Sequence, residues 1–311
     1  MPLLDIERRY QNDELRAWRP DSNHAAAFAG RNNHPLFALS AAPLMQDTKK
    51  EVFLYRALIT TLKQINPSYT WKAQYQQDGT CVGQGGKLGA DTLEAIQHVF
   101  NGTKWYGRCS VAGCYAGSRV DIGGQPGSWQ GSNGSWLAEY FTKIGMLMLK
   151  DIGLPEDAMR DDEVLALKWT RSREGIPKDY ETAARRFPIQ TASLVTTFEE
   201  AAAAIQNGYP VVTCSSRIPS GKRDSQGFSP ASNRGGHCTL YWGVRWDRPG
   251  LLYQNSWSND WGSGAKYPED QPDGSVWLTA DEVNKALAAR DTYVISHANG
   301  FEKQKLNFRL I

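Results

Sequence analysis

Apolar side chains recur every three or four residues along several stretches of the first two thirds of the chain, which is the spacing of one helix face. The stretch from 48 to 65 shows this spacing clearly. Its apolar members are Val52, Tyr55, Leu58, Ile59 and Leu62. Asp47 stands where an N-terminal cap is needed, and Asn66 and Pro67 follow the last turn. We therefore predict a helix over 48–65.

Three further stretches have helical spacing: residues 82–100, 135–149 and 198–207. The first of them carries glycines at positions 83, 85, 86 and 89. A glycine inside a helix costs about 1 kcal/mol relative to alanine, so we expect neighbouring groups to pack closely against this helix. The glycine- and serine-rich residues 101–135 are expected to form loops, and residues 150–191 to be irregular.

The pattern changes at Tyr209, after which short β-like runs alternate with turn residues. These runs are 210–214, 238–244, 251–254 and 276–278, with a last strand at 292–296. Thr279 and Glu282 form a capping box that predicts a helix ending at Ala289. A mainly helical front half and a mainly β back half indicate an α+β fold with two packed lobes.

The first 45 residues are rich in turn-forming residues and are interpreted as an arm or covering segment. The expected organisation is an N-terminal arm and helix of no assigned role, a main domain of two lobes, and a tail. Their limits are 1–69 for the arm and helix, 70–300 for the main domain (70–208 helical, 209–300 β), and 301–311 for the tail.

Composition and charge exclude several classes of function. Hydrophobic residues make up 41% of the chain and the net charge is +2, which indicates a folded protein and gives no reason to expect a nucleic-acid or membrane partner. We find neither a signal peptide nor a membrane-spanning stretch, so a cytoplasmic protein is expected, with later incorporation into a phage particle as one alternative. Five cysteines without a disulfide-framework spacing favour a reducing compartment.

Three segments carry candidate chemistry: 76–83 around Cys81, 235–240 around His237, and 254–262 around Asn255. A cysteine nucleophile needs a nearby base and a positive field, because a free thiol is mostly protonated at neutral pH. Cys81 stands where a predicted helix begins, and a helix N-terminus supplies part of that field. His237 opens a strand, and Asn255 ends the next one. A hairpin can bring the two side by side, so that the amide orients the imidazole.

In these segments the sequence resembles the papain (C1) family of cysteine peptidases, in the manner of its divergent bacterial and phage members. The resemblance rests on His237 opening a strand, on Asn255-Ser256-Trp257 ending the next, and on Trp261-Gly262. It covers roughly residues 70–300. It implies a papain-like two-lobed fold, with a helical N-terminal lobe, an antiparallel β-barrel-like C-terminal lobe and the active site between them. Trp257 and Trp261 would then shield the His–Asn hydrogen bond from water.

The resemblance also assigns the front half of the site. Gln76 would join the Cys81 N–H in an oxyanion hole, with Gln74 and Gln77 as competing candidates. An alternative register aligns Cys81 with an earlier cysteine of the family motif and places Gln84 at the nucleophile position, which would give an inactive enzyme. Residues 129–147 resemble the substrate strand and following helix of the family. Gly131, Trp129 and Trp257 are therefore expected to bind substrate.

The activity implied is hydrolysis of peptide bonds through a Cys81–His237–Asn255 triad and a thioester. The resemblance implies a thiolate–imidazolium pair with the pKa of Cys81 strongly lowered, and a protein or peptide substrate with no cofactor and no metal. The usual inhibitory propeptide of the family is not recognisable in the first 70 residues. That arm is a candidate surface for an assembly partner.

Other functions stay open at this point. One is a papain-like structural protein with a vestigial site, for example a phage virion component. A second is a cell-wall amidase or an acyl transferase with the same chemistry. A metal site made of Cys109, Cys114, His237 and Cys238 has loose spacing. The glycine-rich run at 83–86 lacks the Gly-Lys-Ser/Thr ending of a nucleotide loop.

Overall fold

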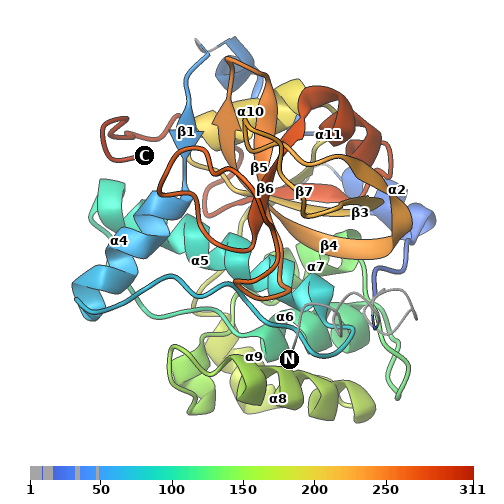
Figure 1. The fold of residues 1–311 in the computed structure, drawn as a ribbon. Helices are drawn as coiled ribbons and strands as arrows, with labels where there is room; N and C mark the ends of the chain where they lie inside the picture. The colour runs from blue at the N-terminus through green and yellow to red at the C-terminus, as the bar shows by residue number, and fades with distance from the viewer. Residues whose placement is uncertain (1–8, 10–16, 32–35, 47–48) are drawn as a thin grey trace.

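The computed structural model describes residues 9, 17–31, 36–46 and 49–311, and it places most helices on one side of the molecule and the sheet on the other (Figure 1). The helical side is built around a long central helix, α5. Its elements are α4 (Tyr55–Ile65), α5 (Cys81–Asn101), α6 (Val111–Ala116), the π-helix η2 (Gly117–Ile122), α7 (Gly134–Lys143), the 3-10 helix η3 (Leu149–Ile152), α8 (Met159–Arg171) and α9 (Lys178–Ala184).

The other side is an antiparallel sheet whose strands are not arranged in the order of the chain. Its strands are β1 (Val52–Phe53), β2 (Thr191–Leu194), β3 (Val211–Pro219), β4 (Ala231–Arg245), β5 (Gly250–Gln254), β6 (Ser275–Thr279) and β7 (Thr292–Ser296). The strand order is β2-β7-β3-β4-β5-β6, with β1 paired to β4. Among the described strands β2 and β6 are the two edges, so the sheet is open and does not close into the barrel that the sequence suggested.

Helices α10 (Phe198–Gln206) and α11 (Ala280–Leu287) pack beside the sheet (Figure 1). Both begin at a threonine whose hydroxyl accepts a hydrogen bond from the third helical residue, as the Thr279 capping box predicted. The N-terminal elements are α2 (Ser22–Ala29), α3 (Phe37–Ser40) and the 3-10 helix η1 (Ala42–Gln46). Helix α2 lies against α7, where His24 and Arg31 both contact the carboxylate of Glu139.

The glycines of α5 allow the close packing that the sequence predicted. A Cβ atom at Gly85 would lie 3.2 Å from the backbone nitrogen of Thr239 in β4. A Cβ at Gly89 would lie 2.6 Å from a methyl carbon of Val212 in β3. Real Cβ atoms are essentially never as close as 2.6 Å to another group, and 3.2 Å is tighter than most of their contacts. Helix α5 can therefore sit directly on the sheet because these positions lack side chains.

The helix predicted over 48–65 is shorter than expected. Val52 and Phe53 form β1 and pair with Val244 and Gly243 of β4, so the helix begins at Tyr55. Tertiary pairing overrides the helical spacing there. The C-terminal limit at Asn66 is confirmed, while Asp47 lies outside the described residues.

Two regions predicted to lack regular structure contain helices. In residues 101–135, α6 begins at Ser110, whose side chain caps the helix, while the buried Asp162 of α8 accepts the N–H groups of Val111 and Ala112. Residues 150–191 contain α8 and α9. For α6 the cause is a carboxylate 50 residues away, which stabilises a helix that its own glycine-containing sequence disfavours. The helix predicted over 135–149 ends at Lys143.

None of the helices in the described ranges is both long enough and apolar enough to span a membrane. The limits predicted for the arm, the two lobes and the tail stay predictions.

Candidate active site

Cys81 is the first residue of α5, and its side chain is fully buried. The preceding residue, Thr80, makes no capping hydrogen bond to the helix, because its hydroxyl donates to Glu163 Oε1 at 2.6 Å. The N–H groups of the first turn therefore act on the Cys81 thiol and favour its ionised form. Gln84, the nucleophile position in the alternative register, lies one turn further along the helix.

His237 and Asn255 are brought together by the pairing of β4 with β5. The register places Leu240 opposite Gln254. His237 precedes Leu240 and Asn255 follows Gln254, so the two side chains lie on the same side of this pair and meet. His237 Nε2 lies 2.8 Å from Asn255 Oδ1, and both side chains are buried. Since an amide oxygen only accepts, Nε2 carries the proton, and Nδ1 of the neutral ring is the basic nitrogen. The interaction is the one expected for an orienting asparagine.

Trp257 covers this pair. Its ring centroid lies 4.8 Å from that of His237, with the planes tilted by 38°. Trp261 packs edge-on against Trp257 at 6.0 Å, and both indoles are almost fully buried. The two tryptophans therefore exclude water from the His237–Asn255 hydrogen bond, as the sequence suggested.

The Cys81 thiol reaches the strand of His237. The backbone N–H of Cys238, the residue after His237, points at the Cys81 sulfur and acts to lower its pKa. This proximity follows from the close packing of α5 on β4 at Gly85. The structure thus places Cys81, at the start of α5, beside the β4 strand that carries His237, and the His237 side chain contacts Asn255 just after β5.

Gln76 lies beside the same strand ends but is engaged in other contacts. Its N–H donates to Ser256 O at 2.8 Å, and its side-chain Oε1 accepts from the Ser256 hydroxyl at 2.5 Å. Its Nε2 donates to Asp78 O at 2.9 Å. Gln74 is also buried, and the choice among Gln74, Gln76 and Gln77 for the oxyanion hole stays a prediction.

Glu163 of α8 organises the loop before Cys81, a role that no sequence signal indicated. Its buried carboxylate accepts the N–H groups of Gln77 and Asp78 within 3.1 Å, besides the Thr80 hydroxyl. Burial raises its pKa, although these donors act to lower it. Glu163 therefore fixes the backbone that leads into Cys81.

The predicted substrate residues have different environments. Gly131 has a φ of +128°, which favours glycine, and its N–H donates to the Tyr115 hydroxyl at 2.7 Å. Trp129 is 40% exposed and stacks under the guanidinium of Arg119 at 4.1 Å. Trp257 lies against the ring of His237.

Residues 17–19, here termed the covering segment, lie across this site. The sequence indicated an arm or covering segment in the first 45 residues, but not which residues cover the site. The segment pairs in parallel with Ser132: Ser132 N donates to Ala17 O at 2.9 Å, and Arg19 N donates to Ser132 O at 2.8 Å. On its other side, Trp18 N donates to Gly236 O at 3.3 Å, directly before His237. The N–H of Ala17 points at the Cys81 sulfur. The covering segment therefore connects Ser132, before α7, with Gly236 of β4 beside Cys81.

The covered site holds its thiol and imidazole in neutral forms. Burial raises the pKa of Cys81 to about 12, against the lowering effect of the backbone N–H groups of Cys238, Ala17 and Val82. Burial lowers the pKa of His237 to about 4, although the Asn255 hydrogen bond acts to raise it. Both effects arise because water is excluded from the charged forms. The thiolate–imidazolium pair stays a prediction for the uncovered site.

The remaining cysteines do not form the metal site considered above. Cys238 is bonded to Cys214 in a disulfide that joins directly paired residues of β4 and β3. Nothing in the spacing of the five cysteines predicts this pair. Cys109 and Cys114 are free and buried, with sulfurs 3.6 Å apart. In the part of the chain that the structure describes, no group of three His, Cys, Asp or Glu side chains is arranged to bind a metal ion.

Solved structures with a similar architecture are cysteine proteases. Xylellain, a cysteine protease from Xylella fastidiosa, matches with a TM-score of 0.62 and 15% identity, over 92% of this chain and 97% of that one. proCathepsin B S9 from Trypanosoma congolense matches with a TM-score of 0.51 and 13% identity, over 97% and 99%. The proform of the ragweed pollen cysteine protease Amb a 11 matches with a TM-score of 0.54 and 14% identity, over 91% and 77%.

These likenesses confirm the papain-like fold that the three sequence segments predicted. A scan of protein-family models and a search of curated proteins found no match. At identities of 13–15%, these likenesses show the fold alone.

Proposed function

We propose that this chain is a cysteine-type peptidase that cleaves peptide bonds and is held latent by its own covering segment. The observation that carries the proposal is the 2.8 Å contact of His237 Nε2 with Asn255, on the strand whose next residue points its N–H at Cys81. Nucleophile, base and orienting group are the three parts that thiol-based acyl transfer needs. The structural neighbours are cysteine proteases, and two of the three are proforms.

The first half of the reaction forms a thioester. The Cys81 proton moves to His237 Nδ1, and the thiolate attacks the carbonyl carbon of the peptide bond. The oxyanion accepts hydrogen bonds from the Cys81 N–H and from a glutamine side chain, for which Gln76 is the candidate, and one such donor contributes about 10²–10³ in rate. The C–N bond then breaks as His237 Nδ1 returns its proton to the leaving amine.

The second half releases the acyl group. Water attacks the thioester carbon while His237 Nδ1 accepts the water proton, and the C–S bond breaks to give a carboxylic acid and free Cys81. Asn255 holds the ring plane through both halves, since its oxygen accepts from Nε2–H whether the imidazole is neutral or protonated.

Latency follows from the position of the covering segment. It uses the backbone groups of Ser132 and Gly236, which flank the nucleophile and which an extended substrate needs for its own hydrogen bonds. It also buries Cys81 and His237, so that neither charged form is favoured. Displacing the segment readmits substrate and water together.

The proposal is tested by measuring hydrolysis of casein and of fluorogenic peptides by the full-length protein. Four proteins are compared: the parent, Trp18→Ala to loosen the covering segment, the same variant with Cys81→Ala, and the same variant with Cys114→Ser as a matched buried-cysteine control. We expect Trp18→Ala to be at least 10-fold more active than the parent. Cys81→Ala abolishes this activity, and Cys114→Ser leaves it intact.

Other outcomes distinguish the alternative functions. Release of amines from purified peptidoglycan without hydrolysis of casein would assign a cell-wall amidase, and transfer to an added amine would assign an acyl transferase. A Cys81 that reacts with iodoacetamide no faster than Cys109 or Cys114 in the Trp18→Ala protein would assign a structural protein with a vestigial site. In that case the N-terminal arm becomes the candidate surface for an assembly partner.

A further inference from the structure

A cavity on the helical side of the molecule shares no lining residue with the candidate active site. Its volume is about 410 Å³, which is within the range of small-molecule sites. It lies where the end of α4, the loop that follows it, the approach to α6 and the start of α8 meet. The side chains that could contact a ligand include Leu62, Ile65, Tyr69, Arg108, Glu156 and Met159. A molecule bound here would not need the covering segment to move.

Arg108 is a buried arginine with an unused donor group. Its side chain is almost fully buried, and its Nε donates to Asp91 Oδ2 at 2.9 Å. Its Nη2 atom is also buried and makes no hydrogen bond to any group of the described residues. Asp91 accepts from Lys87 Nζ as well, at 3.0 Å, so two cations share one carboxylate. Arg108 therefore keeps N–H donors and part of its charge for an acceptor on a ligand.

Glu156 presents an unused acceptor beside this arginine. Its Oε1 accepts the backbone N–H of Arg108 at 3.2 Å, whereas its buried Oε2 makes no hydrogen bond within the part of the chain that the structure describes. Gly107 makes the contact possible, because its φ is +115° and a Cβ there would lie 2.7 Å from Glu156 Oε1. Burial, together with the charge of Asp91, raises the pKa of Glu156. A donor or a positive charge at Oε2 would offset that cost.

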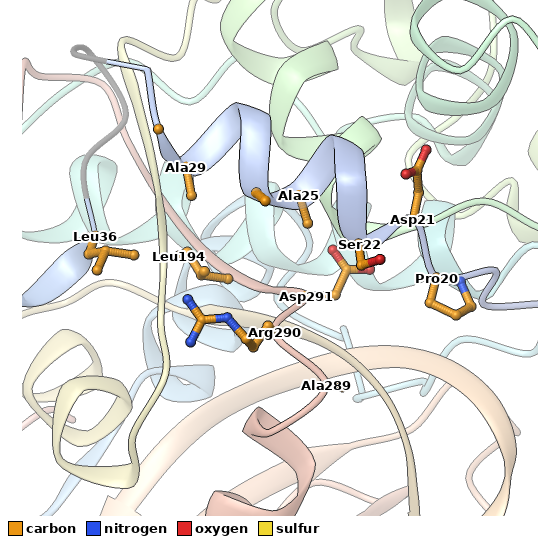
Figure 2. A pocket seen from close by; sticks show the side chains of 12 residues that line it. Pro20, Asp21, Ser22, Ala25, Ala29, Leu36, Leu194, Ala289, Arg290 and Asp291 are labelled. Atoms are coloured by element: carbon orange, nitrogen blue, oxygen red, sulfur yellow. The ribbon is translucent and has the colours of Figure 1, made fainter.

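The cavity beneath α2 has a different character. Its volume is about 330 Å³, and Figure 2 shows Asp291 and Arg290 on one side of it and Ala25 and Ala29 of α2 on the other. The carboxylate of Asp291 already accepts from the indole of Trp18. That cavity therefore belongs to the covered active site, whereas the cavity at Arg108 is separate from it.

The unused groups at the Arg108 cavity have opposite charges. The charged side chains in contact there are Lys87, Asp91, Arg108 and Glu156, which together carry no net charge. A lone anion or a lone cation would leave one unused group buried without a partner, whereas a zwitterion supplies both. Because Arg108 and Glu156 touch each other, the two charges of the ligand must lie close together. The ammonium and carboxylate groups of an α-amino acid are one carbon apart and meet this requirement.

We propose that this cavity binds a free α-amino acid with a large apolar side chain, whose carboxylate accepts from Arg108 and whose ammonium group donates to Glu156. Leu62, Ile65 and Met159 supply apolar surface for the side chain of the ligand. Ile65 is 53% exposed, so covering it removes apolar surface from water and contributes to binding. The site does not depend on the proposed peptidase function.

The test is isothermal titration calorimetry of the full-length protein with L-leucine at pH 7.5. Two analogues are titrated beside it: 4-methylpentanoate, which lacks the ammonium group of leucine, and 3-methylbutylamine, which lacks its carboxylate. Glu156→Gln removes a charge but keeps an acceptor for the Arg108 N–H. Arg108→Lys keeps a cation for Asp91 but removes the guanidinium. Asp121→Asn is the matched control, because Asp121 is a partly buried carboxylate outside the cavity whose pKa burial also raises.

We expect leucine to bind with a Kd of about 1 mM or below, and each analogue to bind at least about 10-fold more weakly. Glu156→Gln and Arg108→Lys each weaken leucine binding at least about 10-fold, and Asp121→Asn leaves it unchanged. The proposal is overturned if leucine shows no saturable binding, if either analogue binds as tightly as leucine, or if Glu156→Gln retains the parental affinity. Circular dichroism identifies a variant that fails to fold, and in that case the two analogues decide the question on the parent protein.

Discussion

Replacing Trp18 with alanine is expected to expose Cys81 to solvent reagents. The indole anchors the covering segment through its 2.7 Å hydrogen bond to Asp291. A hydrogen bond to a charged group contributes about 1.5–3 kcal/mol, and each 1.4 kcal/mol changes an equilibrium tenfold. Loss of this bond therefore raises the fraction of molecules with an open cleft by roughly 10- to 150-fold. Loss of the buried ring adds to the effect.

The assay is the rate of alkylation of Cys81 by iodoacetamide at pH 7.5, followed by peptide mass spectrometry. When the segment opens and closes faster than the reagent reacts, the observed rate is proportional to the open fraction. Trp18→Phe keeps a ring but removes the N–H, so its rate is expected between those of the parent and Trp18→Ala. Trp246→Ala is the matched control, because that indole bonds Gln206 on another part of the surface.

The reasoning is refuted if Trp18→Ala alkylates Cys81 at the parental rate. It is equally refuted if Trp246→Ala accelerates the reaction as much, since the effect would then come from general loosening of the fold. Alkylation of the buried Cys109 and Cys114 in the same samples reports such loosening directly.

Three further predictions concern activity and stability. Asn255→Ala removes the acceptor that holds His237 Nε2 and is expected to lower kcat by about 10- to 100-fold, measured with a peptide substrate in the Trp18→Ala background; an unchanged kcat would count against an orienting role. In the fold, the pKa of Asp291 is raised to about 6, so the protonated form favours folding and stability is lost as pH rises from about 4 to above 6. Asp291→Asn retains an acceptor but cannot ionise, so its free energy of unfolding is expected to exceed that of the parent by up to about 3 kcal/mol at pH 8 and to equal it near pH 4. Denaturant titrations that give the same difference at both pH values would contradict this. Gly89→Ala places a Cβ 2.6 Å from Val212 and is expected to destabilise the protein by about 1–3 kcal/mol in urea unfolding, whereas a neutral result would show that α5 has room to move from the sheet.

The back half of the chain could be predicted well because its structure is local. Strands such as 251–254 are short apolar runs bounded by turn residues, and Thr279 marks its helix with its own side chain. The His237–Asn255 hydrogen bond follows from the pairing of consecutive strands. Such neighbours in sequence are also neighbours in space.

The front half was less predictable because distant groups decide it. Val52 becomes a strand residue by pairing with Val244, and α6 is stabilised by Asp162 of α8. The carboxylate of Glu163 that fixes the loop before Cys81 lies in the short charged run 160–163, which does not indicate such a role. These contacts have no signature within a local window of sequence.

The covering segment falls within the first 45 residues, which the sequence indicated only as an arm or covering segment, without the residues that lie over the site. Its residues Ala17, Trp18 and Arg19 belong to a mixed stretch with no helical or strand periodicity. Its position depends on backbone hydrogen bonds to Ser132 and Gly236, which any residue type can make. The hydrogen bond of the Trp18 indole to Asp291, by contrast, depends on the side chain.

The most direct test of the account is the pH dependence of Cys81 alkylation in the Trp18→Ala protein, with and without His237→Ala. If Cys81 and His237 act as nucleophile and base, the thiol reacts readily at pH 6. His237→Ala then lowers that rate at least about 10-fold and shifts the profile to that of an ordinary thiol, whose pKa is about 8.5. Identical profiles with and without His237 would contradict the central claim that these two residues form one catalytic site.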